Sequence, residues 1–304
     1  MSSFTIRSND PSVGAQLQGW LDRMQLPLPR ALEIVVEVTE EIRSDVHPNV
    51  LFRQPEVSIH PHDASGGLSV SWDHAPAVAH LPHGADSATV FLSIAATQDL
   101  ERCCRFFFSM LLILLVRRVG WHHLHAATWL DPSGRGWAFA GDWKVGKSTT
   151  TALLASCGWP VGGDDVIFLA ESEDGVTTIA RRGEIGLREG GMTLLGKRGG
   201  VFDASRRKSL FTPEELGGRW VQTIRPEVLL FPTIGEGTTS AEPIGASEVL
   251  AQLVRWSAWV ILEPALAQGH LDLLASLGRQ ARSYRVTLGT DLFENPEILL
   301  DIVS

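Results

Sequence analysis

The chain has 304 residues, of which 44% are hydrophobic and 20% are charged, and its net charge is −9. This composition predicts a globular protein with a packed core and excludes a largely disordered chain. The acidic balance argues against nonspecific binding to nucleic acid, which needs a basic surface. We therefore expect no nucleic-acid partner.

Cellular location and redox state are predicted from the apolar runs and the cysteines. The three cysteines include one adjacent pair and no CxxC pair, which indicates reduced thiols rather than a disulfide framework. The N-terminus lacks the charged and apolar regions of a signal peptide. The most apolar stretch, 106–116, is shorter than the roughly 20 residues of a membrane span. We expect a cytoplasmic protein with no membrane partner.

Residues 1–97 are expected to form a smaller N-terminal α/β or β-rich region. Alternating or β-branched patterns predict strands at 31–38, 56–60, 68–72 and 88–94. The loops between these strands are rich in Pro, Gly, Asp and His. A region of this size can present a surface that recognises a substrate, for example by strand addition.

From residue 98 onward the pattern alternates between helices and strands. A long apolar face predicts a helix over 98–119, and the apolar segments 125–130 and 136–140, joined by an Asp-Pro-Ser-Gly turn, predict a hairpin. The other expected elements are a helix at 148–156, strands at 166–169 and 228–231, and helices at 246–254 and 271–282. This alternation predicts an α/β core, and we assign residues 98–304 to one larger domain.

The segment from Gly141 to Ser148, GDWKVGKS, fits the phosphate-binding pattern G-x-x-x-x-G-K-[ST]. Its glycines let successive backbone N–H groups point toward phosphate oxygens, and the loop opens a helix whose N-terminus favours anions. Lys147 is expected to contact the β- and γ-phosphates, and Ser148 to bind Mg²⁺. The chain has only four lysines and two of them lie in this loop, which argues against a plain glycine-rich turn. The expected ATP-binding residues are Gly141, Asp142, Trp143, Lys144, Val145, Gly146, Lys147, Ser148 and Thr149.

Two adjacent carboxylates, Asp164 and Asp165, follow Lys147 by seventeen residues or slightly more. Beside a phosphate site, such a pair can hold Mg²⁺ and can take a proton from an attacking hydroxyl. The composition of Gly-Gly-Asp-Asp is also typical of a solvated turn. The nearby phosphate-binding pattern favours the functional interpretation.

His125, the GDWKVGKS loop and the Asp164–Asp165 pair, in this order and at these short spacings, resemble the catalytic domain of the HPr kinase/phosphorylase family. The resemblance is closest over residues 120–170. It implies a P-loop kinase core of the type shared with ATP-dependent phosphoenolpyruvate carboxykinase, and it makes residues 98–304 the catalytic domain. The family transfers phosphate from ATP to a protein serine. Its shorter relatives include kinases that phosphorylate a serine of a lasso peptide precursor, and this chain is at least as similar to those.

The resemblance also implies roles for individual residues. Lys147 and Ser148 serve ATP and Mg²⁺, Asp164 is the general base, and Asp165 helps to organise the metal. His125 is implied to lie near the active site and to take part in catalysis. Three further residues are assigned no role, namely Glu184, Lys208 and Arg225.

Several alternatives stay open at the level of sequence. The chain is expected to be an ATP-dependent kinase whose partner is a protein or peptide carrying a serine, but a small-molecule kinase could use the same residues. A nucleotide-binding regulator needs only a metal ligand and no second carboxylate. The acidic net charge favours acceptors with a basic or neutral leader. A homo-oligomer is left open.

Overall fold

The structure is a computed structural model that describes residues 4–42, 46–62, 65–204 and 207–303. The chain forms two compact units. The first consists of Met1–His122 with Ile261–Ala267, and the second of His123–Val260 with Gln268–Ser304. Within the described part of the chain, no helix is both long enough and apolar enough to cross a membrane.

The first unit is built on a seven-stranded sheet in the order β1-β2-β7-β6-β5-β4-β3. Its strands are β1 Phe4–Ser8, β2 Leu32–Thr39, β3 Phe52–Gln54, β4 Val57–Pro61, β5 Leu68–Trp72, β6 Ala77–Leu81 and β7 Ser87–Ser93. β1, β2 and β7 are parallel, and the remaining neighbours are antiparallel. Alternate residues of β2 are buried (Leu32, Ile34 and Val36), as a sheet with one face on a core requires.

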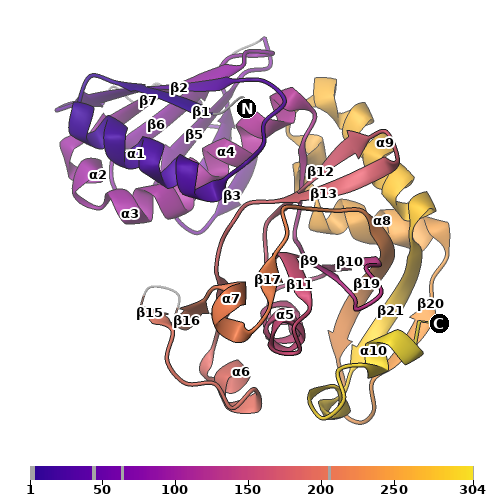
Figure 1. The fold of residues 1–304 in the computed structure, drawn as a ribbon. Coiled ribbons are helices and arrows are strands. Elements are labelled where there is room, and N and C mark those ends of the chain that lie inside the picture. Colours follow the sequence, from indigo (N-terminus) through magenta and orange to yellow (C-terminus); the bar gives the residue numbers. More distant parts are fainter. Residues whose placement is uncertain (1–3, 43–45, 63–64, 205–206, 304) are drawn as a thin grey trace. The chain divides into compact units, whose positions relative to one another are not determined.

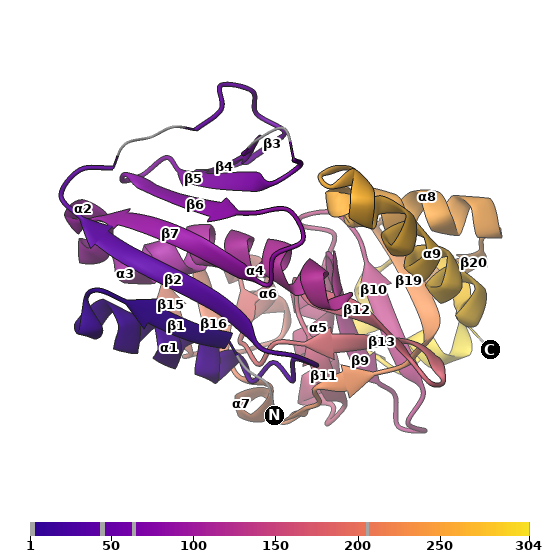
Figure 2. The same cartoon turned by 90° about the horizontal axis from the view of Figure 1, so that it is seen from above.

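Helices cover one face of this sheet (Figure 2). They are α1 Pro11–Met24, α2 Ile94–Gln98, α3 Leu100–Cys103, a π-helical turn η1 Cys104–Phe108, α4 Ser109–Val116 and a 3₁₀ turn η2 Arg117–Val119. α1 begins where the Asp10 side chain accepts hydrogen bonds from the backbone N–H groups of Ser12 and Val13. Trp20 of α1 packs edge-to-face on Phe108, with ring centroids 6.3 Å apart. A buried ion-pair cluster, in which Glu263 contacts the guanidinium groups of Arg117 and Arg118, fastens 261–267 to this unit.

The second unit has a central seven-stranded sheet in the order β17-β11-β9-β10-β19-β21-β20. Its strands are β9 Ala126–Leu130, β10 Gly136–Ala140, β11 Pro160–Gly163, β17 Arg219–Trp220, β19 Pro226–Ile234, β20 Ser240–Pro243 and β21 Arg282–Leu288. β10, β19 and β21 are parallel to one another. β9 is antiparallel to both of its neighbours, β10 and β11, so β11 runs in the same direction as β10.

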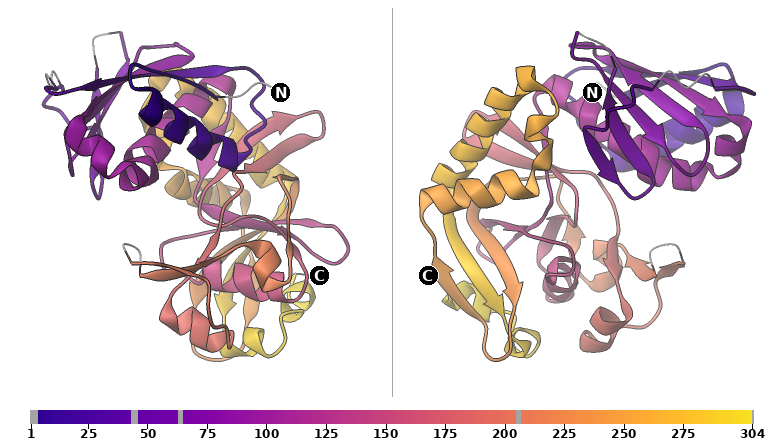
Figure 3. Two further views of the ribbon diagram at one scale, coloured as in Figure 1. Left: turned by 60° about the vertical axis from the view of Figure 1, so that its left-hand side comes forward. Right: turned by 180° about the vertical axis from the view of Figure 1, so that it is seen from behind.

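Two smaller sheets and several helices complete the second unit. The small sheets have the orders β18-β13-β12-β8 and β14-β16-β15. Their strands are β8 His122–Leu124, β12 Ile167–Ser172, β13 Gly175–Ala180, β14 Ile185–Leu187, β15 Val201–Asp203, β16 Lys208–Phe211 and β18 Thr223–Ile224. The helices are α5 Lys147–Ser156, α6 Glu189–Leu194, α7 Pro213–Leu216, α8 Ala246–Trp256, α9 Pro264–Gln280 and α10 Ile298–Asp301, with 3₁₀ turns η3 Ala258–Ile261 and η4 Thr290–Phe293. The last residue of η3 and the first turn of α9, through Ala267, belong to the first unit. In both views of Figure 3 the segment from β14 to β16 lies beside α5.

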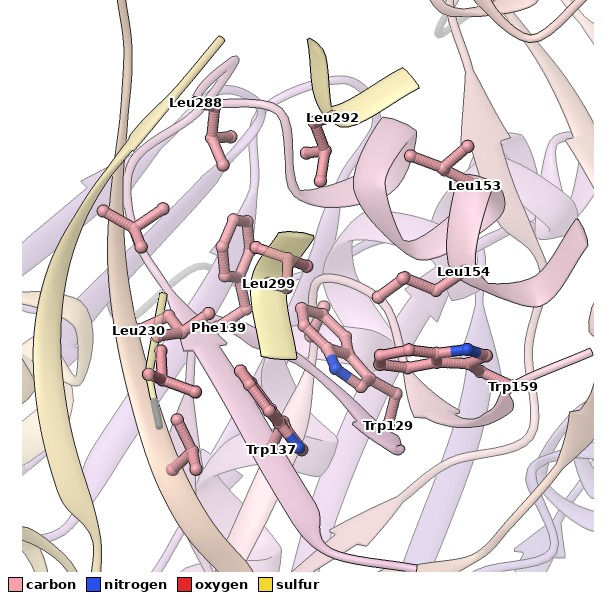
Figure 4. Packing of buried hydrophobic residues seen from close by; sticks show 14 residues of the cluster. Trp129, Trp137, Phe139, Leu153, Leu154, Trp159, Leu230, Leu288, Leu292 and Leu299 are labelled. Atoms are coloured by element: carbon pink, nitrogen blue, oxygen red, sulfur yellow. The ribbon is translucent and has the colours of Figure 1, made fainter. Parts of the chain in front are cut away.

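Aromatic side chains dominate the core between α5 and the central sheet (Figure 4). Trp129 and Trp137 lie opposite each other on β9 and β10 and are fully buried. The indole N–H of Trp137 donates to Oδ2 of Asp131 at 3.0 Å, so this buried polar atom is satisfied. Leu153 and Leu154 of α5 pack on this cluster and hold the helix against the sheet.

The α/β class, the predicted hairpin and the strands and helices expected from the sequence are confirmed, with small shifts of their ends. Two helices are exceptions. The one expected at 98–119 is divided into α3, η1, α4 and η2, which begin after Asp99, and the one expected at 271–282 begins already at Pro264, while Arg282 belongs to β21. The predicted boundary after residue 97 also differs from the division into compact units, which falls after His122. The reason is that α2, η1 and their neighbours pack on the strands of the first sheet.

Candidate functional site

Three neighbouring strands of the central sheet bring the sequence-predicted residues to one edge. β10 ends at Ala140, directly before the loop Gly141–Ser148, and β11 ends directly before Asp164. β9 lies between them and runs the other way, with Ala126 opposite Ala140. The N-terminal end of β9, preceded by His125, therefore lies at the same edge as the C-terminal ends of β10 and β11. The crossover through α5 connects β10 to β11 and is short because only one strand, β9, lies between them.

Close packing fixes β11 against β9 just before the two aspartates. A Cβ atom at Gly162 would lie 2.4 Å from Oγ1 of Thr128 and 2.7 Å from Cδ1 of Ile224. Only glycine fits this approach. The Gly-Gly part of the Gly-Gly-Asp-Asp segment therefore belongs to a buried strand, and the alternative that the whole segment is a solvated turn is wrong.

The loop Gly141–Ser148 has the backbone that an anion-binding nest requires. Lys144 and Gly146 have φ angles of 66° and 94°, in the left-handed region. α5 begins at Lys147, and its N-cap residue Gly146 has no side chain to accept a hydrogen bond from the first N–H groups of the helix. The first N–H groups of α5 are thus left for a ligand, where the helix dipole favours negative charge.

Lys147 is buried and points back over its own loop. Its Nζ donates to the backbone oxygens of Gly141 at 2.8 Å and Asp142 at 2.7 Å, and it lies 2.8 Å from Nε2 of His125. An ammonium group has three protons, so these three contacts use all of them. Burial lowers the pKa of Lys147, whereas the carboxylates of Asp165, Asp164 and Asp142 act in the opposite direction.

His125 connects Lys147 to the aspartate pair. Because the ammonium of Lys147 can only donate, Nε2 of His125 must accept, and its ring proton is on Nδ1. Nδ1 lies 3.2 Å from Oδ1 of Asp165, to which it donates. Burial lowers the pKa of His125 and favours this neutral tautomer, although Asp165 partly offsets the effect.

The surroundings of Asp164 shift the pKa of its carboxyl group upward. Burial, followed by the negative charge of Asp165, raises its pKa to about 6, while a hydrogen bond from the Ser148 hydroxyl and the charges of Lys208 and Lys147 act against this rise. Its Oδ1 is inaccessible to solvent and has no hydrogen-bond partner among the described residues. Asp165 has a φ of 88° and its side chain is half exposed. The carboxylate of Asp164 is thus largely withdrawn from solvent, whereas the carboxylate of Asp165 faces it.

The residue types at this edge fit Mg²⁺. Mg²⁺ at phosphoryl-transfer sites is held by one or two carboxylates, with substrate phosphates and water as the remaining ligands. The exposed carboxylate of Asp165 and the hydroxyl of Ser148 supply such ligands, and the unpartnered oxygen of Asp164 remains available to accept a proton. Among the described residues, no group of three or more His, Cys, Asp or Glu side chains is placed to hold a metal ion by itself.

The other loop residues line the approach to this edge. Val145 lies under Gly141, with Cγ2 at 3.1 Å from the position of a Cβ there, and Thr149 packs against Gly191 of α6. Trp143 is 66% exposed, and the guanidinium of Arg188 lies 5.8 Å from the centre of its ring. Sequence reasoning missed Arg188, because a single arginine before a short helix carries no pattern.

Of the three residues without an assigned role, the structure places one near the site. Lys208 influences the pKa values of both Asp164 and Lys147 through its charge, so it belongs to the surroundings of the site. Glu184 is exposed. Arg225 donates through Nε to the backbone oxygen of Asp174 at 2.9 Å, on the turn between β12 and β13. No described contact brings Glu184 or Arg225 to the edge that holds Asp164.

No family model matches the chain, and no curated protein matches it. Among solved structures, the chain is similar to the HPr(Ser) kinase/phosphatase from Coxiella burnetii, at 12% sequence identity and a TM-score of 0.33. The match covers 60% of this chain and 87% of the other. At this TM-score the match defines neither the fold nor the activity of the chain.

Proposed function

We propose that the chain is an ATP-dependent kinase that transfers the γ-phosphate to a serine hydroxyl of a protein or peptide. The proposal rests on one observation: Lys147, His125 and the Asp164–Asp165 pair lie together at the edge formed by β9, β10 and β11. A phosphate-binding loop alone supports nucleotide binding. A buried carboxylate beside it, in addition to an exposed one, supports transfer to a hydroxyl acceptor.

The loop binds the nucleotide's phosphates through its backbone N–H groups and the free N-terminus of α5. Lys147 exchanges at least one of its three present hydrogen bonds for a phosphate oxygen, because it has no proton left over. Ser148 and Asp165 hold Mg²⁺, which when bound neutralises charge on the phosphates. His125 acts as a positioning residue, since it contacts both Lys147 and Asp165.

Asp164 is the general base of the proposed reaction. The serine oxygen bonds to the γ-phosphorus, the bond to the bridging oxygen of ADP breaks, and the hydroxyl proton passes to Asp164. Its unpartnered Oδ1 provides the lone pairs that such a proton needs. Lys147 stabilises the negative charge that develops on the transferred group.

The choice of a polypeptide serine as acceptor follows the resemblance of His125, the loop and the aspartate pair to the HPr kinase/phosphorylase family. Free serine or another small hydroxyl compound would fit the same chemistry. A nucleotide-dependent regulator would bind ATP without modifying any acceptor. The products formed from peptides and from free serine distinguish these two alternatives from a peptide kinase.

The experiment compares Lys147→Ala with Arg279→Ala in the last turn of α9. The control removes an exposed positive charge whose guanidinium contacts the hydroxyl of Ser276 and which has no role in the proposed site. Each protein is incubated with γ-labelled ATP, Mg²⁺ and serine-containing peptides or free serine, and intact mass reports the product. We expect Lys147→Ala to lose about 10²-fold or more of transfer, and Arg279→Ala to keep it within several-fold.

Near-normal transfer in a folded Lys147→Ala protein contradicts the assignment of this loop. Modification of free serine without any modified peptide favours a small-molecule kinase. ATP binding with no product from any acceptor favours a regulator.

A further inference from the structure

The small sheet β14-β16-β15, together with α6, lies next to the phosphate-binding loop. β14 and α5 are in contact, and Arg188, between β14 and α6, reaches the ring of Trp143. A Cβ at Gly191 of α6 would be 3.0 Å from Oγ1 of Thr149, so α6 packs on the first turn of α5. Whatever binds to this sheet is therefore held near the loop.

β15 is an edge strand with one exposed apolar side chain on each face. Within the part of the chain that the structure describes, β15 pairs only with β16. Val201 and Phe202 are consecutive, so their side chains point to opposite faces, and they are 67% and 66% exposed. Leu194 of α6 is 54% exposed as well. An exposed apolar edge strand is a template for pairing with another chain.

The charge of this region is opposite to that of the whole protein. At the described positions between 181 and 208 there are seven basic and three acidic residues, a net charge of +4, although the chain as a whole carries −9. Arg188, Arg198 and Arg207 are among the exposed members. Residues 1–97 contain five basic and eleven acidic residues. A local surface of this kind attracts an acidic partner and repels a basic one.

We propose that the free edge of β15 binds an extended acidic segment of the polypeptide substrate by strand addition. The inference rests on the proposed kinase function for the identity of that polypeptide. Main-chain hydrogen bonds supply affinity, and Val201 and Phe202 each receive apolar side chains on one face of the added strand. Arg198 and Arg207, two exposed residues that flank β15 in the sequence, select for acidic residues in the bound segment.

A second copy of this chain is a poorer occupant of the same edge. Pairing two β15 strands would bring two segments of net charge +4 together. Like charges across an interface cost free energy and slow association. The local charge also reverses the expectation, based on the net charge of the chain, that the substrate has a basic or neutral leader.

Docking and phosphorylation take place at separate parts of the substrate. β15 is separated from β14 by one strand, a distance of roughly 10 Å, and β14 is the strand that contacts α5. A bound segment beyond β15 is one strand spacing further away. Since an extended residue spans about 3.3 Å, the acceptor serine follows or precedes the docked segment by several residues.

The test is a binding measurement without nucleotide. The probe is a fluorescein-labelled peptide of about ten residues that alternates valine with glutamate, and its counterpart has lysine in place of glutamate. Fluorescence anisotropy is measured for the wild-type protein, for a Val201→Ser/Phe202→Ser double variant, and for Leu51→Ser. Leu51 is 44% exposed next to β3, an edge strand of the first unit, so its substitution is a matched control and also tests that edge.

We expect the wild-type protein to bind the glutamate peptide and not the lysine peptide, with an affinity that falls as salt is added. The double variant should bind at least about ten-fold more weakly, and Leu51→Ser should bind like wild type. All three proteins should keep the same thermal shift with Mg²⁺–ATP, which shows that they are folded.

Four results overturn the proposal. These are no binding of either peptide, equal binding of both peptides, loss of binding in Leu51→Ser alone, and a change of oligomeric state in the double variant by sedimentation, which would show that a second copy covers the edge. Failure of the kinase proposal is separate, because an absent Mg²⁺–ATP shift leaves the peptide measurement standing.

Discussion

Replacement of Asp164 by asparagine should stabilise the protein while it abolishes transfer. The two side chains have the same shape, but asparagine cannot ionise and cannot take the proton from the attacking serine hydroxyl. Burial and the neighbouring charge of Asp165 raise the pKa of Asp164 to about 6 from its ordinary value of 3.8. Above pH 6 the folded protein therefore holds an ionised carboxylate that the unfolded chain accommodates more easily.

The magnitude follows from this difference in pKa. A group whose folded pKa is raised stabilises the folded state below its unfolded pKa, and that stabilisation is lost as the pH rises through the folded value. The difference of about two pKa units between the folded and unfolded states corresponds to a loss of about 3 kcal/mol of folding stability at pH 8. Because part of the side chain is accessible, we expect Asp164→Asn to gain about 2 kcal/mol at pH 8. Near pH 4 the gain should fall below about 1 kcal/mol, because wild-type Asp164 is then protonated.

Urea unfolding at pH 8 and pH 4, with a chelator present and no nucleotide, measures the gain in stability. Asp165→Asn is the control, since its half-exposed carboxylate accepts from His125 and its substitution should change stability by less than about 1 kcal/mol. Transfer by Asp164→Asn should fall by about 10²-fold or more, with Mg²⁺–ATP binding largely kept. An Asp164→Asn protein that is less stable at pH 8, or that turns over normally, refutes the reasoning.

Two further predictions concern stability. Burial lowers the pKa of His122 to about 4 and that of His123 to about 3, so both stay neutral when folded while the unfolded chain takes up protons below about pH 6.5. Stability should therefore fall as the pH drops, by about 2 kcal/mol for each histidine at pH 5. Urea unfolding at pH 5 and pH 7.5 measures this loss, which should be smaller in His123→Asn than in the wild-type protein. Glu263→Gln leaves the two buried arginines of its cluster without their counter-charge and should cost about 3–5 kcal/mol. Glu33→Gln, in an exposed ion pair with an arginine, should cost less than about 1 kcal/mol, and urea unfolding measures both variants.

The grouping of Lys147 with the aspartate pair could be predicted from the sequence, because spacing and topology are linked, whereas the roles of these residues stay predictions. A lysine at the start of a helix and two aspartates seventeen residues later allow one helix and one short return strand. α5 and β11 have these lengths, and parallel strands must end at the same edge. Placing His125 there required the antiparallel β9, which the predicted hairpin supplies.

Other features depend on contacts that no local pattern encodes. The helices between residues 94 and 119 have an apolar face that could cover either sheet, so composition could not assign them to the first unit. The proximity of Lys208 to Asp164 depends on the pairing of β14 with β16, two strands of three and four residues that are too short to show periodicity. The exposed edge of β15 was missed for the same reason.

The insertion of β9 between β10 and β11 explains why Lys147 can be coupled to Asp165 through a side chain. If β10 and β11 were neighbours, the loop and the aspartates would face each other directly, with no side chain between them. The intervening strand contributes His125, which accepts from Lys147 and donates to Asp165. A phosphate that draws Lys147 away removes the donor to Nε2 and changes the charge that His125 and Asp165 experience. In the proposed mechanism, binding at the loop would therefore be felt at Asp165 through a single neutral imidazole.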